Sequence, residues 1–587
     1  MKLVELRITN FRSLGGSKNI IKFKDIDVII LVGQNNVGKS STLKAYEFFI
    51  NPKQTASKQD FFDYDTNNPI IIEGDFLKEP EDENDKELSK EPDWVNKWVQ
   101  KETGLITIEK KWEKEGKPFS KRTKNESGKF EKGGFGGLNQ IFSKYTPTPI
   151  FINAIETTEN LEKQVNLILE RKHLKELEAS HKKEYDAAIN AIRDIQHCIT
   201  SSAEVDEYNS NINASFQKIF PALELKISIR DEDKGIDILK AFKTNHSIDV
   251  LKQGTERKET FAQHGHGIVR QALFNFLTFM KNEVQETNKK EYLLLFEEPE
   301  LYLHPTTIKL LREELYRLAE NSPFQILCCT HNPQLIDISK PHSSIIRLVK
   351  NPTDETTETY QVGYDIFGSQ ENKNYIQMVN RFNPDVCQVF YADNVIIVEG
   401  DTEAIICREL LQEYGSEHEI FVLNSGSKTN IPFFQRILNH FKIPYTIIHD
   451  SDTRYVYENR GTGQVKYKKD GEPKKLSSWK LNEEIWTEIE NGIDNDNIVH
   501  RLVSVYDFES KNKYEVNTND GKPLSAYKFI QKHKKSKELP ICKFISEILK
   551  NSYSKEWNQQ DIENIEEPYK KKQIYTAKNN SQNLVLF

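Results

Sequence analysis

Two acidic clusters contain the residues whose types and spacing best fit metal chemistry in this chain. Glu399 and Glu403 follow a run of four β-branched residues, and Glu403 falls in the first turn of an expected helix. Asp450 and Asp452 follow a second short apolar run. Carboxylates at the carboxyl ends of parallel strands meet at one edge of a sheet. The pattern therefore predicts a site of hard oxygen ligands suited to Mg²⁺ or Mn²⁺, with simple loop capping as the alternative.

Further along the chain, other residues could complete this site. Glu509 follows the short run Val503–Tyr506, which we expect to be another strand. Lys522 opens a helical stretch, from which it could touch the scissile phosphate of a nucleic acid. Lys428 follows a Gly/Ser turn at the end of a further apolar run and could also face a phosphate.

A phosphate-binding loop lies near the N-terminus. The apolar run Ile26–Val32 leads into Gly-x-x-x-x-Gly-Lys-Ser, and a helix is expected from about residue 41. This is the context that a P-loop requires, because backbone N–H groups and the helix N-terminus can then face phosphates. We expect Lys39 to reach the β- and γ-phosphates of ATP and Ser40 to hold Mg²⁺. The predicted nucleotide-binding residues of the loop are Gly33, Asn35, Asn36, Gly38, Lys39, Ser40 and Ser41.

The acids that would complete a nucleotide site come much later in the chain. A buried apolar run is followed by Glu297, expected to help hold Mg²⁺ through water, and by Glu298, expected to orient the attacking water. Another apolar run ends in Thr-His-Asn-Pro, where His331 fits a switch histidine that senses the γ-phosphate. A glycine-containing helix start at residues 263–267 could bind the γ-phosphate of a nucleotide held by a second subunit.

Composition limits the class of protein. The chain has 587 residues, of which 37% are hydrophobic and 29% charged, so several globular domains are expected. Without a membrane-spanning run, a signal peptide or metal-type or disulfide-type cysteine spacing, a cytoplasmic protein with no membrane partner fits. The net charge of −8 excludes a molecule that is basic throughout. Two basic stretches, Lys110–Lys132 and Lys466–Lys480, leave DNA binding open, with solvated loops as the alternative.

The region between the nucleotide motifs is expected to contain an insert. Asn160–Ile199 has helical apolar spacing broken by polar turns, which predicts helices of ordinary length. It contains no Cys-x-x-Cys motif, which argues against a long arm with a zinc hook. Leu223–Ile238 is expected to form strands that return to the nucleotide domain, and Tyr375–Asp385 is expected to be a helical linker.

These motifs resemble two known building blocks. The Glu-Gly-x-x-Glu and Asp-x-Asp motifs resemble a Toprim domain, the fold shared by topoisomerases, bacterial primases and some nucleases. The Asn-Phe-Arg-Ser turn at residues 10–13, the P-loop, Glu-Glu-Pro-Glu and Thr-His-Asn-Pro resemble the ABC-type ATPase heads of the SMC and RecF group. Two departures are Glu297 in place of the usual Asp and Gly-His-Gly in place of a Ser-Gly-Gly signature. ATP turnover is therefore expected to be slow or to need a partner.

The combination resembles the OLD (overcoming lysogenization defect) family of nucleases, which includes the nuclease subunit of Gabija and OLD proteins attached to some retrons. The implied fold class is α/β, with an ABC-type (SMC/RecF-like) P-loop ATPase head, a helical insert and a Toprim α/β domain. The implied domains are head segments 1–159 and 223–345, a dimerisation insert 160–222, a linker 346–389 and a Toprim nuclease domain 390–587. The implied metal ligands are Glu399, Glu403, Asp450, Asp452 and Glu509, with Lys522 as transition-state stabiliser.

The resemblance implies an ATP-regulated DNA endonuclease that acts in defence against phage. Five carboxylates suffice for two metal ions about 3.5–4 Å apart, besides the ion bound with ATP. The implied partners are DNA and further copies of the chain in a homodimer or homotetramer. An operon partner is also implied, such as a helicase or a retron reverse transcriptase with its RNA–DNA product.

Two other functions stay open at this point. One is a RecF-like DNA-binding ATPase whose Toprim domain grips DNA or a partner without catalysis, in which case Glu399→Ala would leave activity unchanged. The other is a primase-like polymerase that uses the same metals. The absence of zinc-ribbon cysteines argues against the polymerase, and nucleotide incorporation on a single-stranded template would identify it.

Overall fold

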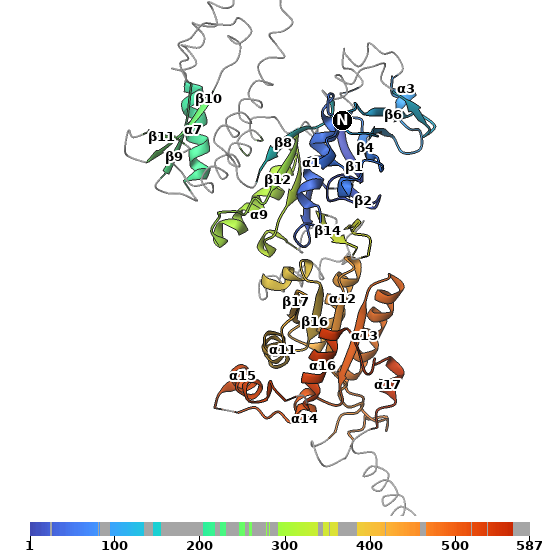
Figure 1. Cartoon of the computed structure of the whole chain (residues 1–587). Helices are drawn as coiled ribbons and strands as arrows, with labels where there is room; N and C mark the ends of the chain where they lie inside the picture. The colour runs from blue at the N-terminus through green and yellow to red at the C-terminus, as the bar shows by residue number, and fades with distance from the viewer. Residues whose placement is uncertain are drawn as a thin grey trace, which may run out of the picture. The chain divides into compact units, whose positions relative to one another are not determined.

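The computed structural model contains two units, Met1–Thr359 and Tyr360–Phe587, each with its own sheets and core (Figure 1). In the part of the chain that is described, no helix is long and apolar enough to cross a membrane. The described residues are 1–23, 26–79, 82, 94–133, 145–153, 203–217, 223–229, 246–252, 258–260, 278, 281, 292–337, 344–351, 353–361, 384–416, 418–457, 465–517, 519–536 and 538–566.

A six-stranded sheet of order β15-β14-β3-β13-β12-β8 forms the centre of the first unit. Its strands from β14 to β8 pair in parallel, and β3 and β13 are buried at every residue, as their continuous apolar sequences require. Helices α1 and α9 contact this sheet. The elements are β3 (Val28–Val32), α1 (Lys39–Ile50), β8 (Thr148–Ile152), β12 (Tyr292–Glu297), α9 (Pro305–Ala319), β13 (Phe324–Cys329), β14 (Ile345–Lys350) and β15 (Thr357–Gln361).

A second sheet, antiparallel and of order β2-β1-β4-β5-β6-β7, packs one face against α1. Side chains such as Ile8, Ile72 and Ile108 join Phe48 and Phe49 of the helix in one apolar core. The short helix α3 (Trp94–Trp98) precedes β5. The strands are β1 (Lys2–Thr9), β2 (Asn19–Lys22), β4 (Ile70–Leu77), β5 (Leu105–Trp112), β6 (Ser120–Lys124) and β7 (Phe130–Lys132).

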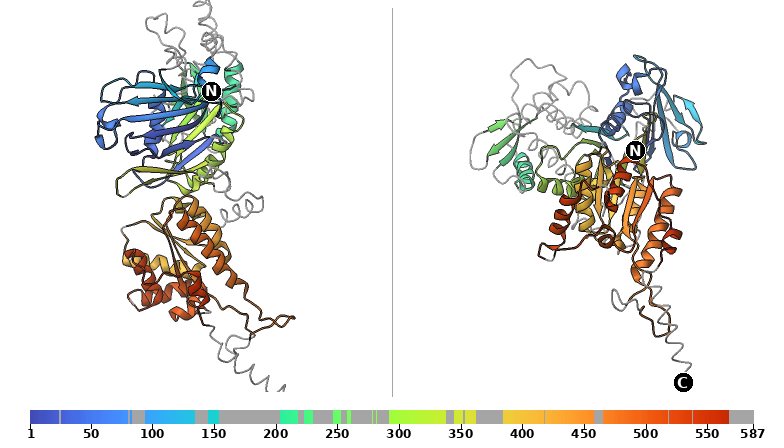
Figure 2. Two further views of the ribbon diagram at one scale, coloured as in Figure 1. Left: turned by 90° about the vertical axis from the view of Figure 1, so that its right-hand side faces the viewer. Right: turned by 60° about the horizontal axis from the view of Figure 1, so that its bottom comes forward.

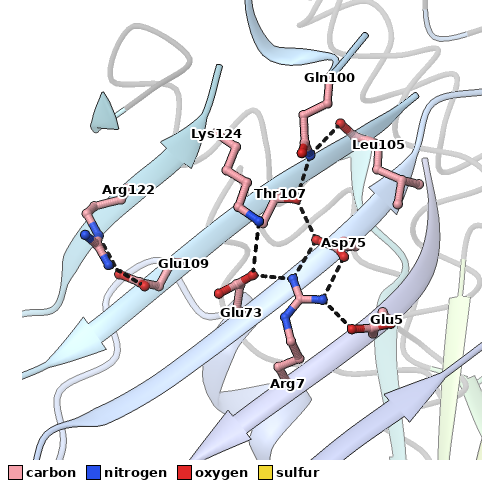
Figure 3. A network of polar contacts seen from close by, with 10 residues as sticks. All are labelled: Glu5, Arg7, Glu73, Asp75, Gln100, Leu105, Thr107, Glu109, Arg122 and Lys124. Carbon is pink, nitrogen blue, oxygen red and sulfur yellow. Dashed lines mark hydrogen bonds and ion pairs between the residues drawn. The ribbon is translucent and has the colours of Figure 1, made fainter. Parts of the chain in front are cut away.

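The other face of this sheet carries charged side chains that link neighbouring strands (Figure 3). Arg7 on β1 donates two hydrogen bonds of 2.8 Å to Asp75 on β4, and it also contacts Glu5 and Glu73. Thr107 on β5 donates to the same Asp75 carboxylate at 2.6 Å. Opposite charges across strands stabilise one register. The charged face therefore helps to align β1, β4 and β5, whereas the apolar face supplies the core.

Part of the expected insert lies within the described residues. Helix α7 (Ala203–Phe216) packs against a three-stranded antiparallel sheet of order β11-β10-β9. A strand is confirmed at the start of the predicted range Leu223–Ile238, as β9 (Leu223–Ile229). It does not return to a sheet of the head as predicted but pairs with β10 (His246–Lys252), and the third strand is β11 (Lys258–Thr260). The predicted helices over 160–199 and the glycine-containing helix start at 263–267 lie outside the described residues.

The head continues beyond the expected boundary at residue 345. Strand β14 pairs in parallel with β3, and β15 extends the same sheet, so residues 346–350 and 357–361 of the expected linker belong to the sheet. Thr357 also donates to the Ser13 carbonyl at 3.1 Å, which ties this segment to the turn before the P-loop. The polar turn expected over 351–359 therefore contains the start of β15. Most of the predicted helical linker Tyr375–Asp385 lies outside the described residues.

The second unit is built on a four-stranded parallel sheet of order β17-β16-β18-β19 (Figure 2). Helices α11, α15 and α16 share an apolar cluster with the sheet, and α12 packs against α13. The strands are β16 (Asn394–Val398), β17 (Ile420–Asn424), β18 (Tyr445–Asp450) and β19 (Val499–Ser504). The helices are α11 (Asp401–Tyr414), α12 (Ile431–His440), α13 (Ser477–Asp494), α14 (Phe508–Asn512), α15 (Gly521–His533), α16 (Pro540–Lys550) and α17 (Gln559–Glu563).

One predicted strand is displaced. The expected strand Val503–Tyr506 is in fact Val499–Ser504, and Glu509 lies in the first turn of α14 instead of at a strand end. The physical reason is the helix cap at Asp507, whose carboxylate accepts a 2.7 Å hydrogen bond from the Ser510 N–H. The chain therefore leaves the sheet at Ser504.

Candidate nucleotide and metal sites

The P-loop has the backbone geometry that its glycines predict. Gly38 has φ 105° and directly precedes α1, and a side-chain Cβ there would lie 2.4 Å from Leu14 Cδ2. At Gly33 a Cβ would lie 2.4 Å from the backbone oxygen of Leu348. Helix α1 has no acidic residue in its first turn and no side chain capping its N-terminus. Its first N–H groups can therefore serve an anion.

Lys39 and the residues around it suit a phosphate. The buried Lys39 ammonium donates to the carbonyl oxygens of Gly33 at 2.7 Å and Gln34 at 2.6 Å. Burial lowers the pKa of Lys39 to about 8. Both acceptors are neutral carbonyls, so the Lys39 ammonium is not hydrogen-bonded to a negatively charged group among the described residues. A phosphate oxygen would therefore be a stronger hydrogen-bond acceptor for it. Three other predicted loop residues, Asn35, Asn36 and Ser40, are exposed.

The turn before β2, residues 10–13, contacts the helix that follows the P-loop. Ser41, predicted to bind nucleotide, lies on α1 with its Oγ 2.7 Å from the Oγ of Ser13. Arg12 of the same turn donates to Asp60 at 2.9 and 3.0 Å. The Asn-Phe-Arg-Ser turn is thus attached both to the first turn of α1 and to a neighbouring loop.

Parallel pairing of β12 and β13 brings the predicted acids and the switch histidine together. Glu297 ends β12 opposite Cys329, and Glu298 follows it with φ 43°. The Nε2 atom of His331 lies 3.7 Å from Oε1 of Glu298. Burial and then the nearby Lys39 charge lower the pKa of His331, so the imidazole is neutral at neutral pH. The P-loop lysine, one acid and the histidine therefore converge at one sheet edge.

Glu300 organises this edge, although the sequence suggested no role for it. One oxygen of its buried carboxyl group accepts hydrogen bonds from Thr330 Oγ1 at 2.6 Å, the His331 N–H at 2.9 Å and the Asn332 N–H at 3.2 Å. The other oxygen has no hydrogen-bond partner among the described residues. Burial raises the pKa of Glu300, despite the bond from Thr330. The only sequence signal was a third acid after the predicted pair.

We expect Glu300→Ala to slow ATP hydrolysis mainly through kcat, because the loop carrying His331 would lose its shared acceptor. Three lost hydrogen bonds at about 1 kcal/mol each sum to about 3 kcal/mol, which corresponds to a reduction in kcat of about a hundredfold. Glu300→Gln keeps one acceptor oxygen and should restore most of the rate. Steady-state ATPase kinetics would measure both, with Glu313→Gln on the exposed side of α9 as the matched control. Equal loss in the Ala and Gln variants would contradict this positioning role.

The acids of the second unit gather at the carboxyl edge of its sheet. Glu399 follows β16 and Asp450 ends the adjacent β18, and the Asp450 N–H donates to Glu399 Oε1 at 2.7 Å. Burial and then mutual repulsion raise the pKa of Asp450 to about 9. Burial, opposed in part by Lys428, raises the pKa of Glu399 to about 7. Burial also raises the pKa of Glu403, which interacts with Glu509. Each shift reflects first the burial of the carboxyl group and then the negative charge of the neighbouring acids.

Two lysines lie by these carboxylates. Lys428 was expected to face a phosphate, but its buried ammonium donates to Asp452 Oδ2 at 2.7 Å and to the Asp450 carbonyl at 2.5 Å. Lys522 is exposed at the start of α15, and its charge partly opposes the rise in the pKa of Glu403. The sheet therefore brings together all five predicted acids and Lys522, and it adds Lys428.

Buried polar groups hold the loop between Asp450 and Asp452 from behind. Arg501 Nε donates to His449 Nε2 at 2.9 Å, so His449 must carry its proton on Nδ1, which donates to the Asp450 carbonyl at 2.7 Å. Arg501 also donates to the Asn482 carbonyl at 3.0 Å, and Asn482 donates to the Ser451 carbonyl at 2.9 Å. None of these residues had a sequence signal beyond the apolar strands that contain two of them.

The carboxylates are of the chemical type that binds divalent cations, although two of them already accept hydrogen bonds from protein groups. Within the described residues, no three acidic, histidine or cysteine groups stand in the arrangement of a finished metal site. Instead Lys428 occupies an oxygen of Asp452, and the Asp450 N–H occupies an oxygen of Glu399. The raised pKa values of Glu399, Glu403 and Asp450 show that more positive charge would be favourable there. Hard oxygen donors of this kind suit Mg²⁺ or Mn²⁺.

We expect Mn²⁺ affinity to rise with pH, because the cation must displace protons from Asp450 and Glu399, whose pKa values are raised to about 9 and about 7. Each displaced proton changes the affinity by about tenfold per pH unit below the pKa. Raised carboxyl pKa values also mean that stability of the metal-free protein falls as pH rises through the same range. Electron paramagnetic resonance of free Mn²⁺ at pH 6 and pH 8 measures the affinity. Equal affinity at both would show that the acids are already ionised.

Together these sites define a P-loop ATPase head joined to a Toprim-type domain that carries an acidic cluster. The family model of the AAA ATPase domain matches residues 1–336, which is more than half of the chain. The model of the overcoming lysogenization defect protein-like Toprim domain matches residues 390–452, and Glu509 and Lys522 lie beyond that match. The chain belongs to the OLD family of AAA ATPase–Toprim proteins. Both matches confirm the expected fold class.

Curated relatives cover most of the chain. The Old nuclease of Escherichia phage P2 is 24% identical over 77% of this chain and 77% of its own length. The endonuclease GajA of Bacillus cereus strain VD045 is 22% identical over 79% of this chain and 77% of its own length. A solved SMC head bound to the C-winged helix domain of ScpA covers 62% of this chain and 98% of its own, with 13% identity and a TM-score of 0.39.

Proposed function

We propose that the protein is a metal-dependent DNA endonuclease whose activity is governed by ATP bound at the head. The observation that carries the proposal is the cluster of carboxylates at the edge of the Toprim-type sheet, where burial and repulsion raise the pKa of Asp450 to about 9. The names of the related nucleases support the same activity. Membership of this family also supports a role in defence against phage.

The proposed reaction is hydrolysis of a phosphodiester bond. A water oxygen forms a bond to phosphorus, and the bond from phosphorus to the leaving sugar oxygen breaks. Bound Mg²⁺ or Mn²⁺, two ions in our proposal, would activate the water and stabilise the leaving oxygen. Glu399, Glu403, Asp450, Asp452 and Glu509 are the proposed ligands. Lys522, exposed beside Glu403, is proposed to stabilise charge on the phosphate in the transition state.

At the head, we propose that Lys39 binds the β- and γ-phosphates and that Ser40 and Glu297 hold the accompanying Mg²⁺. Glu298 would orient the attacking water, and His331 would contact the γ-phosphate. The convergence of Lys39, Glu298 and His331 at one sheet edge supports these roles. Assembly into a dimer or tetramer and an operon partner that supplies target recognition remain parts of the proposal.

Plasmid cleavage by the wild-type chain with Mg²⁺ or Mn²⁺, each with and without ATP, tests the proposed function. We expect metal-dependent nicking or linearisation whose rate changes when ATP is added. Absence of cleavage in every lane, both alone and with the product of the neighbouring gene, would favour the DNA-binding ATPase with a non-catalytic Toprim domain. Identical rates with and without ATP would overturn control by the head.

A further inference from the structure

We propose that the hairpin leaving the Asp450–Asp452 loop is an arm that holds duplex DNA by its phosphates next to the carboxylate cluster. The name basic arm is used for residues 453–457 and 465–476, in which Lys466–Lys475 carries most of the charge. The identity of its ligand rests on the proposed nuclease function. The position of the arm and its suitability for binding phosphate follow from its own contacts, exposure and charge.

The basic arm is ordered β structure. Three backbone hydrogen bonds form a closed set: Val456 N–H to the Lys474 carbonyl at 2.9 Å, Lys474 N–H to the Lys466 carbonyl at 2.7 Å, and Lys466 N–H to the Val456 carbonyl at 2.7 Å. The tip turns at Asp470-Gly471, where Gly471 has φ 85°, a conformation that favours glycine. The backbone of this basic stretch is therefore paired as a hairpin, while its lysine side chains are exposed to solvent.

The root of the arm is fixed to the body of the second unit. Leu476 N–H donates to the Arg454 carbonyl at 3.0 Å, and Arg454 in turn donates to the Glu563 carbonyl at 2.7 Å. The Arg454 guanidinium also lies 5.1 Å from the ring centre of Trp479 on α13. Arg454 is two residues from Asp452 in the chain. The arm is thus attached directly to the loop that carries two of the candidate metal ligands.

Charge on the arm is strongly positive although the chain as a whole has a net charge of −8. Its described residues contain five lysines and Arg454 against Asp470 and Glu472. Among these lysines, Lys468 has an acidic partner, Glu472 at 3.4 Å. The other four lysines are exposed and make no side-chain hydrogen bond or ion pair with a described residue; they are Lys466, Lys469, Lys474 and Lys475.

The hairpin register places like charges together. Tyr467 pairs with Pro473, which sets Lys466 opposite Lys474, and the backbone bond between these two lysines agrees with that alignment. Like charges directly opposite each other destabilise a strand pair. The same arrangement becomes favourable beside a polyanion, where each neutralised phosphate releases counterions. The arm therefore has the electrostatics of a surface whose anionic partner is a separate molecule.

The tip of the arm, from Tyr467 to Pro473, is two-stranded, whereas segment 455–457 pairs with both strands nearer the root. The major groove of B-DNA is about 12 Å wide and admits a two-stranded β-ribbon. Tyr467 near the tip is 62% exposed and could pack on the sugar–phosphate backbone. Because the lysines would bind phosphates and not base edges, the expected binding is independent of sequence.

The test is duplex binding by the full chain with four arm lysines neutralised together, as K466Q, K469Q, K474Q and K475Q. Fluorescence anisotropy with a labelled duplex in EDTA measures affinity without cleavage. We expect the slope of log K against log salt to become shallower by about 0.9 for each phosphate that the arm no longer neutralises. At moderate salt this corresponds to a reduction in affinity on the order of tenfold or more.

Two controls make the result specific. Replacing the same four residues by arginine keeps the charge and should preserve both affinity and slope. Neutralising four exposed lysines of the first unit that lie outside both basic stretches, as K53Q, K58Q, K101Q and K309Q, removes the same net charge elsewhere and should leave the slope unchanged. An arm variant with wild-type affinity and slope would overturn the inference. A variant that loses single-stranded binding but keeps duplex binding would overturn the assignment to duplex DNA.

Failure of this inference can be told apart from failure of the nuclease. If the wild type cuts plasmid and the arm variant cuts with the same rate and salt dependence, the arm inference is wrong and the nuclease stands. If nothing is cut but duplex binding depends on the four lysines, the arm stands and the nuclease proposal fails.

Discussion

Asp450→Ala is expected to abolish metal-dependent plasmid cleavage while DNA binding persists. Asp450 ends β18 and interacts electrostatically with Glu399, Glu403, Asp452 and Glu509. Asp450 therefore interacts with each of the other four candidate ligands. Loss of a metal ligand removes several kcal/mol of transition-state stabilisation, which amounts to about a thousandfold or more in rate.

The measurement is the rate at which supercoiled plasmid disappears at saturating Mn²⁺. Asp494→Ala, which removes an exposed carboxylate at the end of α13, is the matched control and should cut at the wild-type rate. Asp450→Ala needs a second readout, because the Asp450 carbonyl and N–H also take part in the loop. Thermal unfolding of the metal-free variant should be no lower than that of the wild type, since a crowded acid has been removed. If the Asp450→Ala variant cleaved plasmid at the wild-type rate, the reaction would take place at another site.

Lys39→Ala is expected to remove ATP binding at the head and, with it, any effect of ATP on cleavage. The Lys39 ammonium lies inside the P-loop and bonds only to neutral carbonyls of Gly33 and Gln34 among the described residues. A phosphate would replace these with charge-assisted hydrogen bonds worth about 1.5–3 kcal/mol each. Their loss corresponds to a reduction in affinity of about two orders of magnitude.

Binding of a fluorescent ATP analogue and plasmid cleavage with and without ATP would test the Lys39 variant together. Lys53→Ala, on the exposed turn after α1, is the matched control for charge. The same cleavage rate for the wild type without ATP, the wild type with ATP and Lys39→Ala would show that the head does not govern the nuclease. If the Lys39→Ala variant bound nucleotide normally, the P-loop would not be part of the nucleotide-binding site.

The sequence alone determined those features that arise from neighbours along the chain. A glycine-rich loop between a buried strand and a helix has few backbone solutions, so Gly33, Gly38 and Lys39 could be assigned from spacing. The same holds for Glu399 and Asp450, because an apolar run followed at once by an acid places that acid at a strand end. Glu509 was assigned to the correct cluster but to the wrong element, since the cap at Asp507 turned the chain into a helix.

Only the tertiary structure decided which distant side chains meet. Glu300 holds the loop of His331 because β12 and β13 are adjacent, and no local pattern encodes that neighbour. Lys428 bonds to Asp452 across the sheet edge, where the sequence had suggested a phosphate. The conformation of the basic arm could not be predicted from its sequence either. A lysine-rich stretch can form a solvated loop or a hairpin in which like charges lie opposite each other, and only the pairing of its segments distinguishes the two. Burial, cross-strand register and charge crowding are properties of packing between segments, so spacing along one segment could not predict them.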